Sequence, residues 1–115
     1  MLTMLGIPNC DTVRKARKHL EANDVPFQFR DLRKEPLSAD EWDNLLVQDT
    51  TGRLINTRGP SFRKAGIAKD DLNAQNSREL LLAHPTAMKR PVMIDDRSLR
   101  SIGFDAVTFD NFKAG

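Results

Sequence analysis

The spacing of apolar and polar residues predicts a strand, a helix and a second strand at the beginning of this chain. The apolar run at residues 1–5 predicts the first strand. Apolar residues then recur at helical spacing, which predicts a helix over 11–22 that cannot continue through Pro26. Alternating phenylalanines predict a second strand over 25–31. Two strands joined by a helix of this length predict a right-handed βαβ unit with parallel strands.

The middle of the chain is predicted to be mostly helical. Residues 38–41 have the sequence of a capping box, which opens a helix that ends near Gln48. A brief helix is expected over 61–65. Asn76 begins a second possible capping box, which opens a helix that continues to His84.

The end of the chain predicts two strands and a helix. Residues 92–94 and 98–102 form an antiparallel hairpin in this prediction, and a helix covers 105–112. The chain therefore predicts an α/β thioredoxin-like fold, with a four-stranded mixed sheet and flanking helices. We expect one domain over residues 1–115, with a helical insertion over about 38–89 between the βαβ and ββα halves.

Composition and charge exclude several classes of function. The formal net charge of +2 is too small to indicate nucleic-acid binding. No window approaches the roughly 18 apolar residues needed to span a bilayer, and no signal peptide is apparent, so we expect no membrane association. One cysteine forms neither an internal disulfide nor a metal site alone, and the two histidines lack partners at ligand spacing. We therefore expect a cytoplasmic protein without a bound metal or cofactor.

The only cysteine lies where the first predicted strand gives way to the first predicted helix. Cys10 stands at or just before the helix N-terminus, where unpaired N–H groups and the helix dipole favour an anion. The hypothesis is that Cys10 is a nucleophilic thiolate. The alternative is a small buried hydrophobic residue. Asp11 could raise the pKa of the thiol if its carboxylate faced the sulfur, or it could cap the helix backbone.

An arginine and a proline are predicted to lie beside Cys10. In a thioredoxin-like fold, the loop before the third strand brings Arg90 and Pro91 alongside the end of the first strand. A cis Arg90–Pro91 peptide bond fits this position. The alternatives are an ordinary proline at the start of a strand and a solvated surface cation.

Four motifs in order resemble the arsenate reductase/Spx family, and most closely its small YffB-like branch. The resemblance covers nearly the whole chain. It implies a thioredoxin fold with a helical insertion, a catalytic cysteine, and arginines that bind an oxyanion or stabilise the thiolate. The motifs that carry it are Gly6 to Thr12 with Lys15-Ala16, Leu54 to Gly59, Lys89 to Val92, and Ile102 to Phe104.

The resemblance implies three arginines around the cysteine, and this chain matches the pattern only in part. Arg90 matches the arginine before the proline, and Arg58 lies in the second motif. Arg100 is a weak candidate for the third. Arsenate reduction is therefore disfavoured.

The resemblance also implies a dependence on an outside thiol. Spx regulators carry a Cys-x-x-Cys switch, but the second cysteine position is Val13 here. With no resolving cysteine in the sequence, Cys10 would be regenerated by glutathione or another small thiol through a mixed disulfide. Asn9, Thr12 and the backbone next to Pro91 would help to hold this co-substrate, together with the arginines.

Two classes of function follow from these observations. The first is a glutathione-dependent thiol–disulfide oxidoreductase with Cys10, Arg90 and Arg58 as catalytic residues. The second is a non-catalytic protein related to the Spx regulators, which contacts RNA polymerase or another protein partner.

Overall fold

The computed structural model describes residues 1–112 and contains one four-stranded sheet in the order β2-β1-β3-β4. β1 runs parallel to β2 and antiparallel to β3, and β3 is antiparallel to β4. This arrangement confirms the predicted four-stranded mixed sheet. The strands are β1 (Leu2–Gly6), β2 (Gln28–Asp31), β3 (Val92–Asp95) and β4 (Ser98–Ile102).

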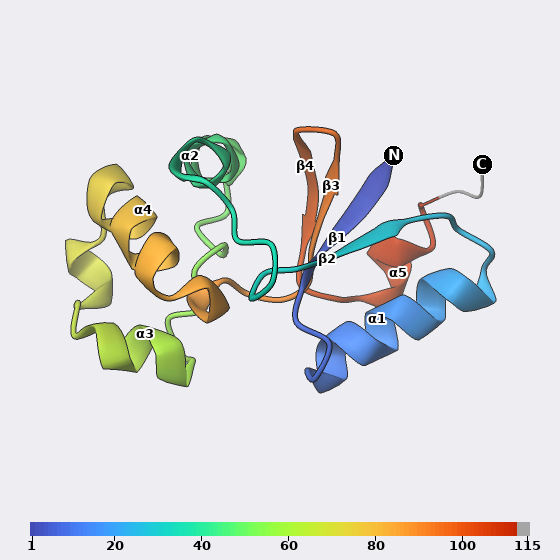
Figure 1. Ribbon diagram of the computed structural model, residues 1–115, viewed down its shortest axis with the longest axis horizontal. Helices are drawn as coiled ribbons and strands as arrows, with labels where there is room; N and C mark the ends of the chain where they lie inside the picture. Colours follow the sequence, from blue (N-terminus) through green and yellow to red (C-terminus); the bar gives the residue numbers. More distant parts are fainter. Residues whose placement is uncertain (113–115) are drawn as a thin grey trace.

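Helices cover the sheet on both sides. Figure 1 shows α1 and α5 on one side of the sheet and α2, α3 and α4 on the other. Within residues 1–112, no helix is both long and apolar enough to traverse a bilayer. The helices are α1 (Asp11–Ala22), α2 (Ala39–Gln48), α3 (Pro60–Ala65), α4 (Ala74–Ala83) and α5 (Ala106–Phe109), with short 3-10 turns η1 (Lys69–Asp71) and η2 (Pro85–Ala87).

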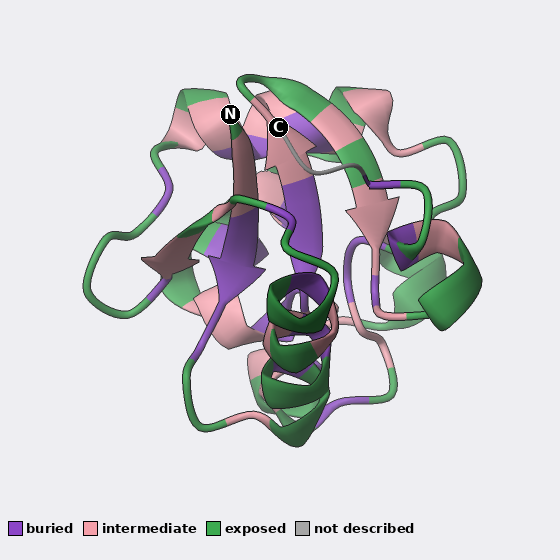
Figure 2. Ribbon diagram, turned by 90° about the vertical axis from the view of Figure 1, so that its right-hand side faces the viewer, coloured by how far each residue is buried: buried purple, intermediate pink, exposed green. Residues whose placement is uncertain are grey.

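The alternation of side chains along β1 and β3 supplies two separate hydrophobic cores. Met4 and Met93 point to the side of α1 and α5, whereas Leu5 and Val92 point to the helices of the insertion. All four side chains are fully buried, because both faces of the two central strands are covered. Figure 2 shows the exposed outer side of α1 in front of this buried centre.

Gly6 lets α1 approach the end of β1 closely. A Cβ atom built at Gly6 would lie 3.0 Å from Cγ2 of Val13 on the first turns of α1. A side chain at this position would be in tight contact with Val13, which would have to shift by a few tenths of an ångström. The short connection from β1 to α1, which carries Cys10, is therefore held against the sheet.

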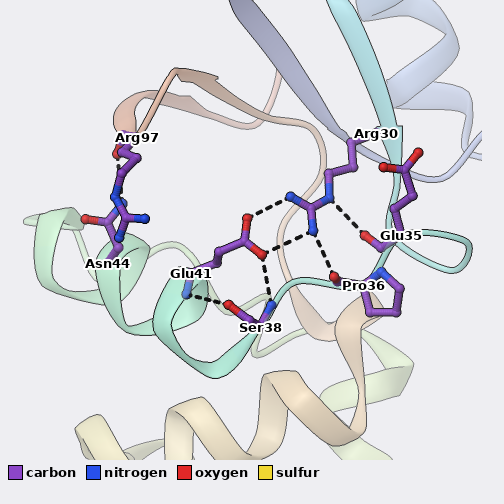
Figure 3. A network of polar contacts seen from close by, with 7 residues as sticks. All are labelled: Arg30, Glu35, Pro36, Ser38, Glu41, Asn44 and Arg97. Carbon is purple, nitrogen blue, oxygen red and sulfur yellow. Dashed lines mark hydrogen bonds and ion pairs between the residues drawn. The ribbon is translucent and has the colours of Figure 1, made fainter.

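A half-buried ion pair attaches the insertion to β2. The Arg30 guanidinium donates to both carboxylate oxygens of Glu41, at 2.7 and 3.2 Å, and to the backbone carbonyls of Glu35 and Pro36. The same carboxylate accepts from the backbone N–H of Ser38, which completes the predicted capping box of α2 (Figure 3). One arginine thus fixes the start of α2 relative to the sheet.

Three elements differ from the sequence-based prediction by more than one residue at one end. β2 begins at Gln28 rather than at residue 25, because the N–H of Val25 closes the end of α1 by donating to the carbonyl of Leu20 at 3.0 Å. The predicted capping box at Asn76 is wrong: Asn76 pairs backward with Asn73, and α4 begins at Ala74. α5 ends at Phe109 instead of reaching 112, since only the N–H of Asp110 still bonds four residues back, to Ala106, whereas those of Asn111 and Phe112 bond to carbonyls three residues back.

We predict that Glu41→Gln destabilises the fold in a pH-dependent manner. The Arg30 guanidinium lowers the pKa of the Glu41 carboxyl, helped by Ser38 and opposed by burial. A lowered native pKa contributes stability above the unfolded pKa of about 4.3, and this contribution is lost as the pH falls through the native value. The expected loss at pH 7 is about 1 kcal/mol, because the pair is only half-buried.

Urea denaturation of the wild type and the variant at neutral and acidic pH checks this prediction. The difference in unfolding free energy should shrink at the acidic pH. Glu35→Gln serves as the control, because Glu35 enters the network only through its backbone carbonyl. An equal deficit of Glu41→Gln at both pH values would contradict the assignment to the ionised carboxylate.

Candidate functional site

Cys10 lies at the N-cap of α1, after the short connection (residues 7–9) that follows β1. Its backbone is extended, with φ −111° and ψ 127°, and its carbonyl accepts the helical N–H of Arg14 at 2.9 Å. The side chain makes no capping hydrogen bond and is partly exposed. Most residues at an N-cap use their side chain to satisfy the first N–H groups of the helix. Cys10 makes no such hydrogen bond, so these N–H groups remain available to a charged sulfur.

The insertion is fastened to the segment before β3 by a short backbone ladder. Ile55 and Met88 form an antiparallel bridge. The N–H of Asn56 donates to the carbonyl of Ala87 at 2.7 Å, and the N–H of Lys89 donates to the carbonyl of Leu54 at 2.8 Å. This ladder places Asn56 and Lys89 at the rim of the Cys10 site.

Besides the start of α1 and the backbone ladder, the segment after Lys89 also borders the site. The Arg90–Pro91 peptide bond is cis, and Pro91 is buried. The carbonyl of Pro91 accepts the N–H of Gly103 at 2.8 Å, which holds the end of β4 beside the start of β3. Gly103 and Phe104 thereby reach the site from the C-terminal part of the chain.

These three segments line an open cavity of about 330 Å³ next to Cys10. A volume of this size suits a small molecule and lies near the lower end of the usual range for ligand sites. The cavity is lined by Cys10, Thr12, Asn56, Lys89, Arg90, Gly103 and Phe104.

Arg90 is anchored at one end of its guanidinium and unpartnered at another. Nη1 donates to the carbonyl of Thr86 at 2.5 Å, and the hydroxyl of Thr86 is hydrogen-bonded to that of Ser61 at 2.6 Å. Nε is buried without a hydrogen-bond partner. A buried polar group without a partner is costly, so this residue beside the cavity keeps one donor unused.

The environment lowers the pKa of the Cys10 thiol below its ordinary value. Partial burial raises this pKa, but the N–H of Val13, the Arg90 guanidinium and the N–H of Thr12 together outweigh that effect. All three stabilise negative charge on the sulfur. The thiolate is therefore favoured over the neutral thiol relative to a free cysteine.

Asp11 does not act against the thiolate in the way that the sequence suggested. Its carboxylate pairs with the guanidinium of Arg14 at 2.6 Å, one helical turn further along α1. Its side chain is largely exposed and does not line the cavity. The ion pair holds the Asp11 carboxylate on the helix surface beside Arg14.

The structure brings together only part of the predicted set of site residues. Cys10, Thr12 and Arg90 line the cavity. Pro91 does not line it, but its carbonyl holds the lining residue Gly103 by a hydrogen bond. Asn9 is exposed and does not line the cavity.

The second and third predicted arginines are placed elsewhere. Arg58 is exposed outside the cavity, where its N–H donates to Oδ1 of Asn56 and its carbonyl accepts from Arg63. Arg100 lies 3.5 Å from the carboxylate of Asp95 and 5.7 Å from the ring centre of Phe112. Neither residue lines the cavity, because a turn directs the first outward and the β4 register directs the second toward the far end of the sheet.

Sequence reasoning missed four lining residues. Asn56 and Lys89 lie inside the second and third motifs, next to the arginines that attracted attention. Gly103 and Phe104 form part of the fourth motif. Their position inside the motifs was the one sign in the sequence that these residues belong to the site. Only the backbone ladder between residues 54–56 and 87–89 shows which residues of the motifs line the cavity. Within residues 1–112, no three histidine, cysteine or acidic side chains gather as a metal site would require.

Comparisons with known proteins give a consistent family. The sequence pattern of the ArsC family matches residues 5–112. The global transcriptional regulator Spx of Listeria innocua is 36% identical over 107 residues, which cover 91% of this chain and 81% of that protein. The solved structure of the YFFB (PA3664) protein has a TM-score of 0.85 at 27% identity and covers 99% of this chain and 100% of its own.

A second solved structure is that of an arsenate reductase (ArsC) related protein from Brucella melitensis. It is 37% identical, with a TM-score of 0.76, and the match covers 96% of this chain and 92% of that chain. The relatives thus include a transcriptional regulator and a protein named after a reductase. Similarity alone does not decide between these activities.

We predict that Arg90→Gln raises the pKa of the Cys10 thiol. The substitution removes the only cation among the groups that lower this pKa. The rate of alkylation by iodoacetamide, measured against pH, reports the titration of the sulfur directly. Arg58→Gln should leave the titration unchanged, because Arg58 does not line the cavity. An unchanged titration in Arg90→Gln would show that this guanidinium does not act on the sulfur.

Proposed function

The chain belongs to the ArsC family, as its motifs predicted, and from this premise we propose that it is a thiol–disulfide oxidoreductase with glutathione as its reducing co-substrate. Cys10 is the nucleophile in this proposal. Arg90 stabilises its thiolate and the anionic groups of the thiol that enters. The observation that carries the proposal is the partly exposed Cys10 sulfur, which faces the first N–H groups of α1 and Arg90 at the edge of an open cavity.

The reaction consists of two thiol–disulfide exchanges. In the first, the Cys10 thiolate attacks the glutathione sulfur of a mixed disulfide, forms a Cys10–glutathione disulfide and releases the other thiol as a thiolate. In the second, the thiolate of another glutathione attacks the glutathione sulfur bound to Cys10. This step releases glutathione disulfide and restores the Cys10 thiolate. Two electrons pass from glutathione to the substrate disulfide.

The amino-acid composition supports an outside thiol as the reductant. Cys10 is the only cysteine of the sequence, so the second exchange has no internal resolving thiol. Asn56 and Thr12 add an amide and a hydroxyl to the cavity wall, which suits a ligand with peptide groups.

Arsenate reduction is not proposed for this chain. Among residues 1–112, Arg90 is the one arginine that lines the Cys10 cavity. An oxyanion held by several guanidinium groups would need further arginines at the sulfur, and both candidates from the sequence lie elsewhere.

We predict that the protein reduces glutathione mixed disulfides and that Cys10→Ser reduces the rate to the uncatalysed background. A serine hydroxyl forms no disulfide and is a far weaker nucleophile than a thiolate at neutral pH. Turnover can be followed by coupling glutathione disulfide to its NADPH-dependent reductase. Mass spectrometry should detect the Cys10–glutathione adduct in the wild type and not in Cys10→Ser.

The matched control for this experiment is Thr12→Val, which keeps the shape of a residue beside the sulfur and removes only a hydroxyl. It should retain the adduct with a modest loss of rate. A wild type without adduct and without turnover above background would overturn the enzymatic proposal.

A second candidate is a partner-binding role in transcription, which the 36% identity to an Spx regulator favours. In this role Cys10 would not be required, because the second cysteine of the Spx switch is replaced by Val13. We predict that binding to purified RNA polymerase, if this is the function, is equally strong for the wild type and Cys10→Ser in a co-migration assay. Absence of binding by the wild type would exclude this candidate.

A further inference from the structure

We propose that Lys89 and Arg53 form a cationic rim over the Cys10 cavity that selects thiols carrying a carboxylate. The inference rests on the proposed oxidoreductase function and adds two residues that recognise the carboxylates of the thiol. Arg53 belongs to none of the motifs that the sequence singled out.

Lys89 is held at the rim by its backbone. Its N–H donates to the carbonyl of Leu54, so its side chain starts from the ladder that joins the insertion to the segment before β3. The side chain lines the cavity together with Cys10 and Arg90. Two cations from neighbouring positions thus face the same small volume.

Because Gly103 has no side chain, the side chains of Lys89 and Arg53 can lie against its backbone. Its φ of +80° lies in the left-handed region, and a Cβ built on it would lie 3.0 Å from Cε of Lys89 and 3.6 Å from Nη2 of Arg53. The two cationic side chains therefore lie over the same glycine, which itself lines the cavity.

The loop that carries Arg53 is fixed by side-chain hydrogen bonds. The carboxylate of Asp49 accepts from the backbone N–H of Thr51 at 3.0 Å and of Leu54 at 2.9 Å, and the N–H of Arg53 donates to the hydroxyl of Thr51. These bonds fix the backbone from which the exposed Arg53 side chain extends toward Gly103.

The charge near the cavity is predominantly positive. Within residues 1–112, none of Lys89, Arg53 and Arg90 forms an ion pair with a carboxylate within 4.0 Å. Asp105 is the acidic residue whose pKa Arg53 lowers, after the larger effects of the N–H and hydroxyl of Thr108. One carboxylate beyond ion-pair distance leaves a net positive rim.

A rim of this charge favours one class of small thiol. An anionic thiol is attracted to the cavity and gains hydrogen-bond donors at Arg90 and Lys89, whereas a cationic thiol is repelled. The entering molecule must also bring a sulfur to Cys10. A thiol with one or two carboxylates, such as glutathione, satisfies both conditions.

The test uses Cys10 converted to its disulfide with neutral 2-thiopyridine. An entering thiolate displaces 2-thiopyridone, whose absorbance reports the rate. Glutathione, glutathione diethyl ester and cysteamine are compared, with each rate corrected for the thiol pKa. The wild type should react fastest with glutathione and slowest with cysteamine. Salt should reduce these differences, because it screens exposed charges.

Lys89→Gln and Arg53→Gln should each slow the reaction with glutathione by roughly two- to fivefold, and the double variant by about tenfold. The rate with the diethyl ester, which keeps the ammonium group and lacks both carboxylates, should not fall and should rise slightly as the repulsion is removed. Lys64→Gln is the matched control, because Lys64 is an exposed lysine on α3 that does not line the cavity. It should leave all rates unchanged.

Two results would overturn the proposal. The first is a wild type that reacts equally fast with glutathione and its diethyl ester after correction. The second is a rate loss in Lys64→Gln as large as that in Lys89→Gln. The proposed function fails separately: selective exchange without catalytic turnover in the coupled assay would leave the cationic rim standing and remove the oxidoreductase.

Discussion

The antiparallel pairing of β1 with β3 is the contact on which both cores and the candidate site depend. Met4 pairs with Met93 and Leu5 with Val92, so each successive pair fills the core on the opposite face of the sheet. The same pairing brings the end of β1, which leads to Cys10, beside the start of β3. A shift by one residue would exchange the two faces, and packing therefore fixes the geometry of the site as well.

The parts of the structure that rest on local sequence patterns could be predicted. Helix α1 and the capping box of α2 follow from periodicity and capping residues, and the four-stranded mixed sheet follows from the order of the predicted elements. The position of Cys10 at the start of α1 follows from the same reasoning, whereas that of Arg90 beside it follows from the thioredoxin-like arrangement of the strands. The ends of β2 and α4 could not be predicted, since hydrogen bonds between specific neighbours decide them.

The remaining side chains of the site depend on contacts between distant segments. No local pattern shows that Asn56 rather than Arg58 faces the sulfur, because the bridge between Ile55 and Met88 sets the orientation. Arg100 illustrates the same limit on a strand. The register of β3 and β4 shifts between Met93 and Ile94, so that Arg100 has no partner in the ladder. An irregularity of this kind changes the direction of a side chain, and the pattern of apolar residues in the sequence does not reveal it.

A site with one cysteine has to balance the activation of its sulfur against access to it. Deeper burial would strengthen the effect of the α1 N–H groups and of Arg90, because charges interact more strongly away from water. It would also raise the pKa of the thiol and hinder the approach of the outside thiol. The partly exposed Cys10 meets both demands at once. With the sulfur at the surface of an open cavity, discrimination between thiols falls to the charges around its mouth, where long-range attraction acts before contact is made.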